Sequence, residues 1–173
     1  TYVYFGLGEF TNANGDLVTG EISRFLAGDP TAGFFIGGFF ITMMFGLPAA
    51  ALAMVKRAKK ERKNDVKALM SSASVTSIVT GITEPIEFSF LFASPLLYGI
   101  HAVLTGLAGS TLYLLNIRHG FGWGAGLIDF GLNLNLSTSG LLIIPVGLVF
   151  GLIYYFIFYY LIDKLNLKVI GRE

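Results

Sequence analysis

The chain has 173 residues, of which 54% are hydrophobic and 13% charged, with a formal net charge of +1. Soluble domains usually carry about a quarter of charged residues, so this composition indicates a membrane protein. The near-neutral charge gives no sign of a nucleic-acid partner, and the lack of cysteine excludes disulfides and cysteine chemistry within the chain. Neither clustered metal ligands nor a phosphate-binding glycine loop is present, so we expect no metal and no cofactor.

Residues 1–30 carry four acids against a single basic residue, Arg24. This balance places the segment outside the cytoplasm or in a re-entrant pocket. The start of the chain has neither an initiator methionine nor a charged region before an apolar one, so we expect no signal peptide. We expect the chain to be part of a longer membrane protein.

Residues 31–55 form the first apolar stretch long enough to cross a bilayer, which takes about 20 residues. Pro48 lies within this stretch and predicts a kink or a helix end near Gly46 and Leu47. The next segment, 56–67, holds seven basic residues against two acids, so its net charge is +5. The positive-inside rule places it in the cytoplasm. We interpret it as a topology signal rather than as a lipid or nucleic-acid recognition site.

The segment 66–83 is too polar for a lipid-facing helix, because seven serine and threonine side chains interrupt it. A re-entrant hairpin from the cytoplasm is the simplest solution, with entry over 68–80, a tip at 81–85 and a return over 86–97. Such a backbone is tolerated at membrane depth where protein or water satisfies it.

Residues 99–116 are then predicted to cross outward and 140–162 to cross back, ending in four tyrosines typical of a membrane interface. Residues 117–139 between them are predicted to form a short helix plus a loop, and the tail after Ile162 is predicted to be cytoplasmic. The predicted fold class is an all-α membrane protein with transmembrane helices plus a re-entrant hairpin.

Glu84 and Glu87 are the only acids between Asp65 and Asp129. A carboxylate in a membrane interior costs several kcal/mol, so it normally marks a functional site. Gly81 and Pro85 beside them indicate a broken helix with free backbone groups. Pro85 suits the first turn of a helix, and the N-terminus of that helix would keep Glu84 ionised even when buried.

A sugar offers several hydroxyl donors, which an ionised carboxylate accepts. The candidate binding residues are therefore Gly81, Thr83, Glu84 and Glu87, with the aromatic faces of Phe88, Phe90 and Trp123. Glu87 has an alternative, structural role as an ion-pair partner of Arg118 or Lys67.

Three further polar residues have more than one interpretation. His101 lies in an apolar helix and is predicted to be a hydrogen-bonded core residue rather than a catalyst. His119 lies in a polar loop and can bind substrate or be structural. Asp129 is expected to pair with Arg118 or another cation rather than to contact substrate.

The motif at residues 81–88 resembles the signature of the membrane (IIC) domain of bacterial phosphotransferase-system sugar transporters, in the glucose, N-acetylglucosamine and maltose group. Segments 24–33, 45–50, 96–98, 165–168 and 171–173 agree with the same family. The resemblance covers essentially the whole chain, although residues 2–10 match less closely.

This resemblance implies that 1–173 is the C-terminal, sugar-binding part of a IIC domain, without the preceding helices, a histidine-bearing segment and the IIB and IIA domains. It implies uptake of a sugar with phosphorylation of its 6-hydroxyl by a IIB phosphocysteine, supplied by IIA, the histidine phosphocarrier protein and enzyme I. Glu84 would then be catalytic. Together with the sequence-based candidates His119 and Trp123, the predicted binding residues are Gly81, Thr83, Glu84 and Glu87. The fragment alone is expected to be inactive.

The same resemblance implies a multi-pass protein of the bacterial cytoplasmic membrane that forms a homodimer through the missing half. It also implies an elevator-like movement, with Gly33, Gly37, Gly38 and Gly46 along the moving boundary. The sugar is most consistent with N-acetylglucosamine, because segments 39–48 and 120–129 look more like that branch. A glucose-specific IIC domain, an ion-coupled secondary transporter and a purely structural or receptor module remain the alternatives.

Overall fold

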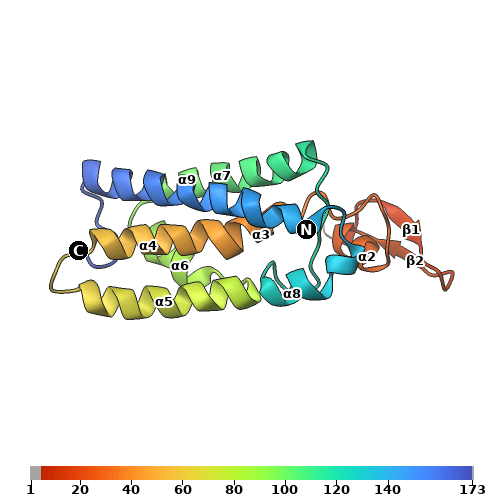
Figure 1. Cartoon of the computed structure of the whole chain (residues 1–173), viewed down its shortest axis with the longest axis horizontal. Coiled ribbons are helices and arrows are strands. Elements are labelled where there is room, and N and C mark those ends of the chain that lie inside the picture. Colours follow the sequence, from red (N-terminus) through yellow and green to blue (C-terminus); the bar gives the residue numbers. More distant parts are fainter. Residues whose placement is uncertain (1–4, 173) are drawn as a thin grey trace.

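The computed structural model describes residues 5–172. Residues 1–4, at the start of the segment expected to lack a signal peptide, and residue 173 lie outside the described part. The long helices run side by side along the molecule (Figure 1). The elements in chain order are β1 (Glu9–Thr11), β2 (Leu17–Thr19), α2 (Glu21–Leu26), α3 (Gly38–Ile41), α4 (Leu47–Arg57), α5 (Lys63–Thr80), α6 (Glu84–Leu91), α7 (Pro95–Leu114), α8 (Leu127–Leu132) and α9 (Ile143–Lys164).

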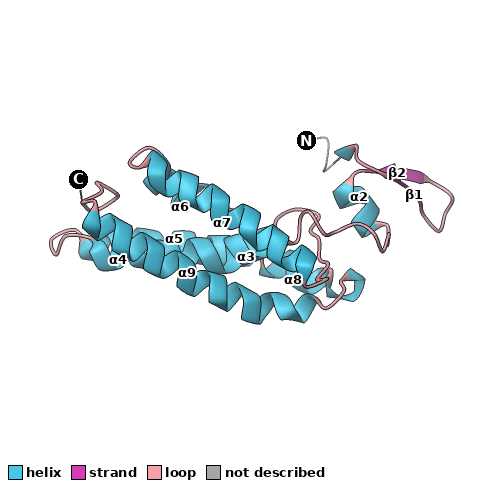
Figure 2. Cartoon of the chain, turned by 90° about the horizontal axis from the view of Figure 1, so that it is seen from above, coloured by secondary structure: helices cyan, strands magenta, loops and turns pink. Residues whose placement is uncertain are grey.

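Within the described residues, three helical stretches are long and apolar enough to cross a membrane, at Gly38–Arg57, Pro95–Leu114 and Gly140–Lys164. The predicted helical membrane fold is confirmed. A small antiparallel hairpin of β1 and β2, which pairs Phe10 with Val18, was not predicted. It lies with α2 at the end of the molecule opposite the C-terminus (Figure 2).

The first membrane span starts later than predicted, at Gly38 rather than at residue 31, because the preceding residues form turns around Asp29 and Gly33. The helix does not end at Pro48. A π-helical turn, η1 (Thr42–Gly46), precedes α4 and keeps helical backbone angles through Leu47. Proline removes one hydrogen-bond donor from the helix, and the wider π turn accommodates that loss without a break.

The predicted hairpin is present as α5, a three-residue tip and α6, but its boundaries differ from the prediction. α5 already begins at Lys63, and the return helix α6 ends at Leu91 rather than at residue 97. The next helix, α7, starts at Pro95 because the Ser94 hydroxyl accepts the Leu97 N–H at 3.4 Å and proline suits a first helical turn. The side of the membrane from which the hairpin enters stays a prediction.

The four glycines assigned to a moving boundary instead pack inside the described part of the chain. A Cβ on Gly38 would lie 2.5 Å from Gly109 Cα, and one on Gly46 would lie 2.7 Å from the Tyr154 ring. A Cβ on Gly33 would touch Phe25, and one on Gly37 would touch backbone oxygens. These glycines allow close contact within one packed body, so they give no support to a sliding surface at these positions.

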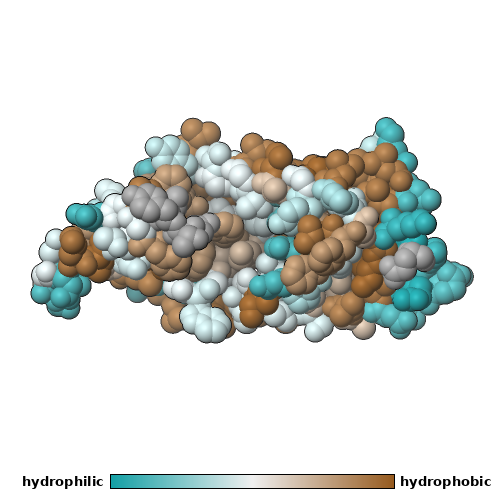
Figure 3. Space-filling view, turned by 180° about the vertical axis from the view of Figure 1, so that it is seen from behind, coloured by the Kyte–Doolittle hydropathy of each residue, from teal (hydrophilic) through white to brown (hydrophobic). Residues whose placement is uncertain are grey.

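On the face that Figure 3 shows, hydrophilic side chains gather at the two ends of the molecule, and hydrophobic and neutral ones lie between them. Leu148, Leu152 and Phe156 on α9 are exposed, as expected for a helix that faces lipid. Segment 117–139 forms a loop, the short helix α8 and the 3₁₀ turn η2 (Leu134–Leu136), which confirms the predicted short helix and loop.

Candidate functional site

The tip of the α5–α6 hairpin is a tight turn of three residues. Gly81 has a φ of +77°, which favours glycine, and its N–H donates to the Ser77 carbonyl at 2.9 Å to end α5. The carbonyl of Thr83 accepts the N–H groups of Ile86 and Glu87 at 3.0 Å and so starts α6. The predicted broken helix therefore exists, with Glu84 as the first residue of its second half.

The hairpin tip packs against the loop at residues 122–126 with almost no space between the two backbones. A Cβ on Gly81 would lie 2.6 Å from the Ala125 nitrogen. A Cβ on Gly124 would lie 2.4 Å from the Thr80 oxygen, and one on Gly126 would lie 2.5 Å from the Gly81 nitrogen. Three glycines therefore hold this loop, which carries Trp123, against the tip that precedes Glu84.

Asp129, at the start of α8, fixes the conformation of this loop. Its carboxylate accepts the Gly122 N–H at 2.9 Å and the Gly124 N–H at 3.2 Å. The expected pairing with Arg118 is wrong, because the Arg118 guanidinium instead donates to backbone carbonyls that include those of Asp29 and Ala32. These two N–H groups and the Asn133 side-chain amide, which donates at 3.2 Å, satisfy the carboxylate locally, so Asp129 acts on the position of Trp123.

Replacing Asp129 by alanine should release the loop and destabilise the protein by about 1–3 kcal/mol, because two N–H groups lose a charged acceptor. Hydrogen–deuterium exchange should rise at the amides of Gly122 and Gly124. Asp65→Ala is the matched control, since Asp65 is an exposed acid in the first turn of α5. Unchanged exchange at these amides would show that the loop is held by the glycine contacts alone.

The two hairpin acids differ in their surroundings. Glu84 is exposed, so the expectation of a buried carboxylate is wrong for the described part of the chain. Glu87 is partly buried, and its Oε1 lies 3.8 Å from His101 Nε2. Its contact is therefore His101 rather than Arg118 or Lys67, the partners expected from the sequence.

His101 connects Glu87 to a buried polar network between α7 and α9. Its Nδ1 lies 3.0 Å from the Tyr154 hydroxyl, which is 3.4 Å from the Thr105 hydroxyl. Thr105 in turn accepts a hydrogen bond from Thr42 of η1 at 3.4 Å. When the Tyr154 hydroxyl donates to Nδ1, the N–H of the neutral ring is at Nε2 and faces Glu87. The core role predicted for His101 is confirmed, but sequence spacing gave no sign of its contact with Glu87.

Replacing Tyr154 by phenylalanine should destabilise the protein by about 1–3 kcal/mol, because buried His101 Nδ1 loses its partner while the ring volume is kept. Thermal unfolding of Tyr154→Phe measures this cost. Tyr160→Phe removes the same atom from an exposed side chain of the same helix and should have almost no effect. Equal stability of the two variants would contradict an energetically significant network.

His119 does not belong to this site. It is fully buried between Phe25, Phe40 and Phe130, and its ring nitrogens lie 3.0 Å and 3.1 Å from the carbonyl oxygens of Gly120 and Phe130. Burial lowers the pKa of His119, an effect that exceeds the opposite influence of the two carbonyls. Of the two roles expected for His119, this position favours the structural one, and a role in substrate binding stays a prediction.

The three aromatic residues predicted to stack on a sugar differ in their exposure. Trp123 is 90% exposed and Phe88 is exposed, so both are open to a ligand. Phe90 is fully buried against Phe158 and cannot form a platform for a sugar. Thr83, another predicted binding residue, is buried under the tip.

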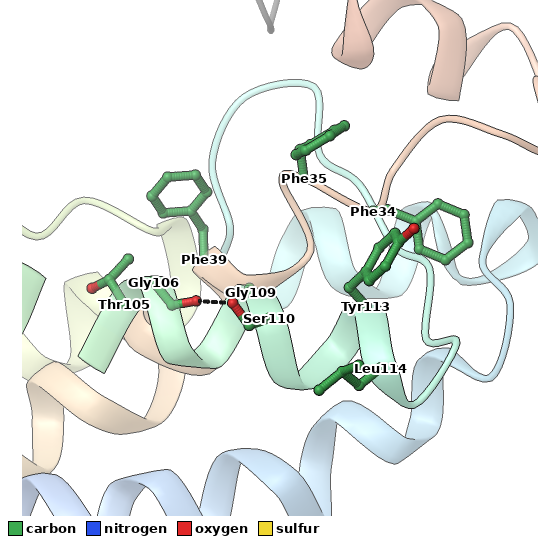
Figure 4. Close-up of a pocket in the computed structure, with 10 residues that line it drawn as sticks. Phe34, Phe35, Phe39, Thr105, Gly106, Gly109, Ser110, Tyr113 and Leu114 are labelled. Carbon is green, nitrogen blue, oxygen red and sulfur yellow. Dashed lines mark hydrogen bonds between the residues drawn. The ribbon is translucent and has the colours of Figure 1, made fainter. Parts of the chain in front are cut away.

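A separate hollow of about 840 Å³ between α3 and α7 does not include the hairpin acids (Figure 4). Phe34 and Tyr113 lie edge to face across one end of it, with ring centroids 5.8 Å apart. The wall on α7 includes Gly106 and Ser110, whose hydroxyl donates to the Gly106 carbonyl at 2.9 Å. Among the described residues that line this hollow, none has a charged or amide side chain. It therefore lacks the carboxylates that would bind sugar hydroxyls, and its small residues instead suit close contact with another helix.

Comparison with known proteins gives consistent results. The family model described as "Phosphotransferase system, EIIC" matches residues 1–106. The N-acetylglucosamine-specific EIIC component of Streptomyces coelicolor is 56% identical over 173 residues, which is all of this chain and 42% of that protein. The glucosamine-specific EIICBA component of Bacillus subtilis is 50% identical over 174 residues, all of this chain and 28% of that protein.

The N-acetylglucosamine-specific EIICBA component of Escherichia coli is 48% identical over 176 residues, which is all of this chain and 27% of that protein. The chain thus spans well under half the length of these relatives.

Proposed function

Because the chain belongs to the EIIC family of the phosphotransferase system, we propose that it is the sugar-binding part of a transporter that takes up N-acetylglucosamine and presents its 6-hydroxyl for phosphorylation. The observation that carries this proposal is the broken-helix tip, which exposes Glu84 beside a loop with an exposed Trp123. Two relatives named for N-acetylglucosamine, each matched over the whole chain, support the choice of sugar.

We propose that Glu84 accepts hydroxyl groups of the sugar and that Trp123 stacks on its apolar face. In the transfer step a bond forms between sugar O6 and phosphorus while the sulfur–phosphorus bond of a phosphocysteine breaks, and Glu84 accepts the proton that leaves O6. Glu87, which faces His101, holds a further hydroxyl. The phosphocysteine comes from a IIB domain because this chain has no cysteine.

The proposed partners follow from the same scheme. The relatives include fusions named EIICB and EIICBA, which supports IIB and IIA domains as neighbours of this one. The histidine phosphocarrier protein and enzyme I would supply IIA, and a homodimer would form through the half of the IIC domain that precedes this chain. An isolated fragment, without these parts, should not phosphorylate sugar.

Glucosamine is the second candidate sugar, because a relative named for it is 50% identical over the whole chain. The two sugars differ at the 2-position, where one carries a neutral acetamide and the other an ammonium group. Competition by N-acetylglucosamine, glucosamine and glucose for uptake by the full-length transporter separates them. Preferential competition by N-acetylglucosamine is the expected result, and stronger competition by either other sugar would change the substrate.

The reaction class has its own test. Uptake by membrane vesicles should require phosphoenolpyruvate and should persist when an uncoupler collapses the ion gradients. Uptake that stops with the uncoupler would indicate an ion-coupled secondary transporter, which can also use broken helices. Sugar that binds without any uptake would indicate a receptor.

We also propose that the loop between α4 and α5 and the C-terminal tail are cytoplasmic, because basic residues gather at this end of the bundle. A cysteine at Lys60 should resist an impermeant thiol reagent in intact cells, whereas one at Ser137, at the opposite end, should react. Strong external labelling at position 60 would reverse the topology.

A further inference from the structure

A groove of about 470 Å³ lies between α4 and α5 at the basic end of the bundle. Three lysines and two serines line it together with apolar residues; the polar members are Lys56, Lys63, Lys67, Ser71 and Ser74. Its walls come from α4 and α5, two helices that lie side by side and pack against each other (Figure 1). We call this feature the cationic groove.

The ammonium groups of the cationic groove are free to bind a ligand. Among the residues that the structure describes, Lys56, Lys63 and Lys67 have no side-chain hydrogen bond or ion pair. By contrast, neighbouring Arg57 is bound to Asp163 at 3.1 Å and stacks on Tyr159. The acids of the same loop do not line the groove, so its charge is not neutralised from within.

The backbone adds to this positive charge. Lys63 is the first residue of α5, an 18-residue helix, and Lys67 follows one turn later. The N-terminus of a helix carries a partial positive charge and unpaired N–H groups, which favour a phosphate. On the opposite wall, the C-terminal end of α4 carries a partial negative charge, which Lys56 in its last turn offsets.

The cationic groove continues into an apolar surface along α4. Leu52, which is half exposed, lines the groove and also a neighbouring apolar hollow of about 620 Å³ between α4 and α9. Met44, Phe45, Leu148 and Leu152 are among the walls of that second hollow. The cationic groove thus adjoins an apolar hollow, and the two share Leu52 as a common wall.

The sequence alone favoured a topology signal for segment 56–67, but the groove and the apolar hollow beside it add a second role. We propose that the cationic groove binds an anionic phospholipid, with its phosphate between Lys56, Lys63 and Lys67 and an acyl chain along Leu52 in the apolar hollow. A free phosphate would not use the apolar hollow, and a soluble protein domain could not reach it at membrane depth. Basic pockets between membrane helices at a cytoplasmic surface suit anionic headgroups on general grounds. This inference does not depend on the sugar that the protein carries.

Native mass spectrometry of the full-length transporter tests the proposal with phosphatidylglycerol and phosphatidylcholine of identical acyl chains. Phosphatidylglycerol should be retained preferentially. The double variant Lys63→Gln/Lys67→Gln should weaken its retention about 25-fold, because each lysine near an anionic headgroup contributes about five-fold to the affinity. The matched control, Lys60→Gln/Lys168→Gln, removes the same charge from exposed residues outside the groove and should change little.

Leu52→Trp should reduce retention of both lipids, because the larger side chain fills the hollow. Equal retention of the two lipids by the unmodified protein would overturn the proposal. So would equal effects of the two lysine pairs, which would indicate general attraction by the loop, or competition by inorganic phosphate as strong as that by the lipid.

Discussion

Replacing Glu84 by glutamine should weaken sugar binding by the full-length transporter about 10- to 150-fold, which corresponds to about 1.5–3 kcal/mol for one charged hydrogen-bond partner. Glutamine keeps the size of the side chain but removes the negative charge and one acceptor. Glu84 is exposed in the first turn of α6 and follows a tip that is held by backbone contacts. The substitution should therefore leave the fold intact.

Two measurements separate binding from chemistry in the Glu84 variant. Calorimetry gives the sugar affinity, and phosphoenolpyruvate-dependent phosphorylation at saturating sugar gives the transfer rate. A base that accepts the O6 proton should affect the rate beyond its effect on affinity. Glu61→Gln is the matched control, because Glu61 is an exposed acid in the loop at the other end of α5. Unchanged affinity and phosphorylation in Glu84→Gln would remove this residue from the site.

Replacing Gly81 by alanine should destabilise the protein by about 2–5 kcal/mol. The left-handed conformation at φ +77° costs about 1–2 kcal/mol for a residue with a Cβ, and overpacking adds about 1–3 kcal/mol. The added Cβ would lie 2.6 Å from the Ala125 nitrogen, in backbone that has little freedom to move. Thermal unfolding of the full-length protein measures the loss.

Two other glycines separate the causes of this effect. Gly15→Ala imposes a similar left-handed conformation, φ +89°, with open space around its Cβ, so it should show only the conformational cost. Gly126→Ala clashes with the Gly81 nitrogen at 2.5 Å without a positive φ, so it should show only the steric cost. If Gly81→Ala were no more harmful than Gly15→Ala, the tip would not depend on its contact with the 122–126 loop.

The placement of Trp123 against the hairpin tip explains why stability and sugar binding should fall together in the Gly81 variant. Gly124 and Gly126 follow Trp123 and touch Thr80 and Gly81 directly. A displaced tip moves the start of α6, where Glu84 lies, away from the loop. Asp129 holds the same loop from its other side, so its alanine variant should affect the site more weakly.

The sequence by itself determined the membrane class, the hairpin and its acidic tip. Apolar stretches of about 20 residues cross a bilayer whatever their neighbours are, and a glycine with a positive φ, such as Gly81, ends a helix for local reasons. The family motif at 81–88 identified the same segment. These features depend on composition and local backbone preference, which can be read along the chain.

Tertiary structure alone decided which polar groups meet. It brought Glu87 of α6 next to His101 of α7. It also made the Asp129 carboxylate accept hydrogen bonds from two N–H groups of the neighbouring loop instead of pairing with Arg118. It also enclosed the fully buried His119 among aromatic rings. Helix rotation and register set these contacts through the packing of residues distant in sequence, and a chain of similar apolar stretches does not reveal them.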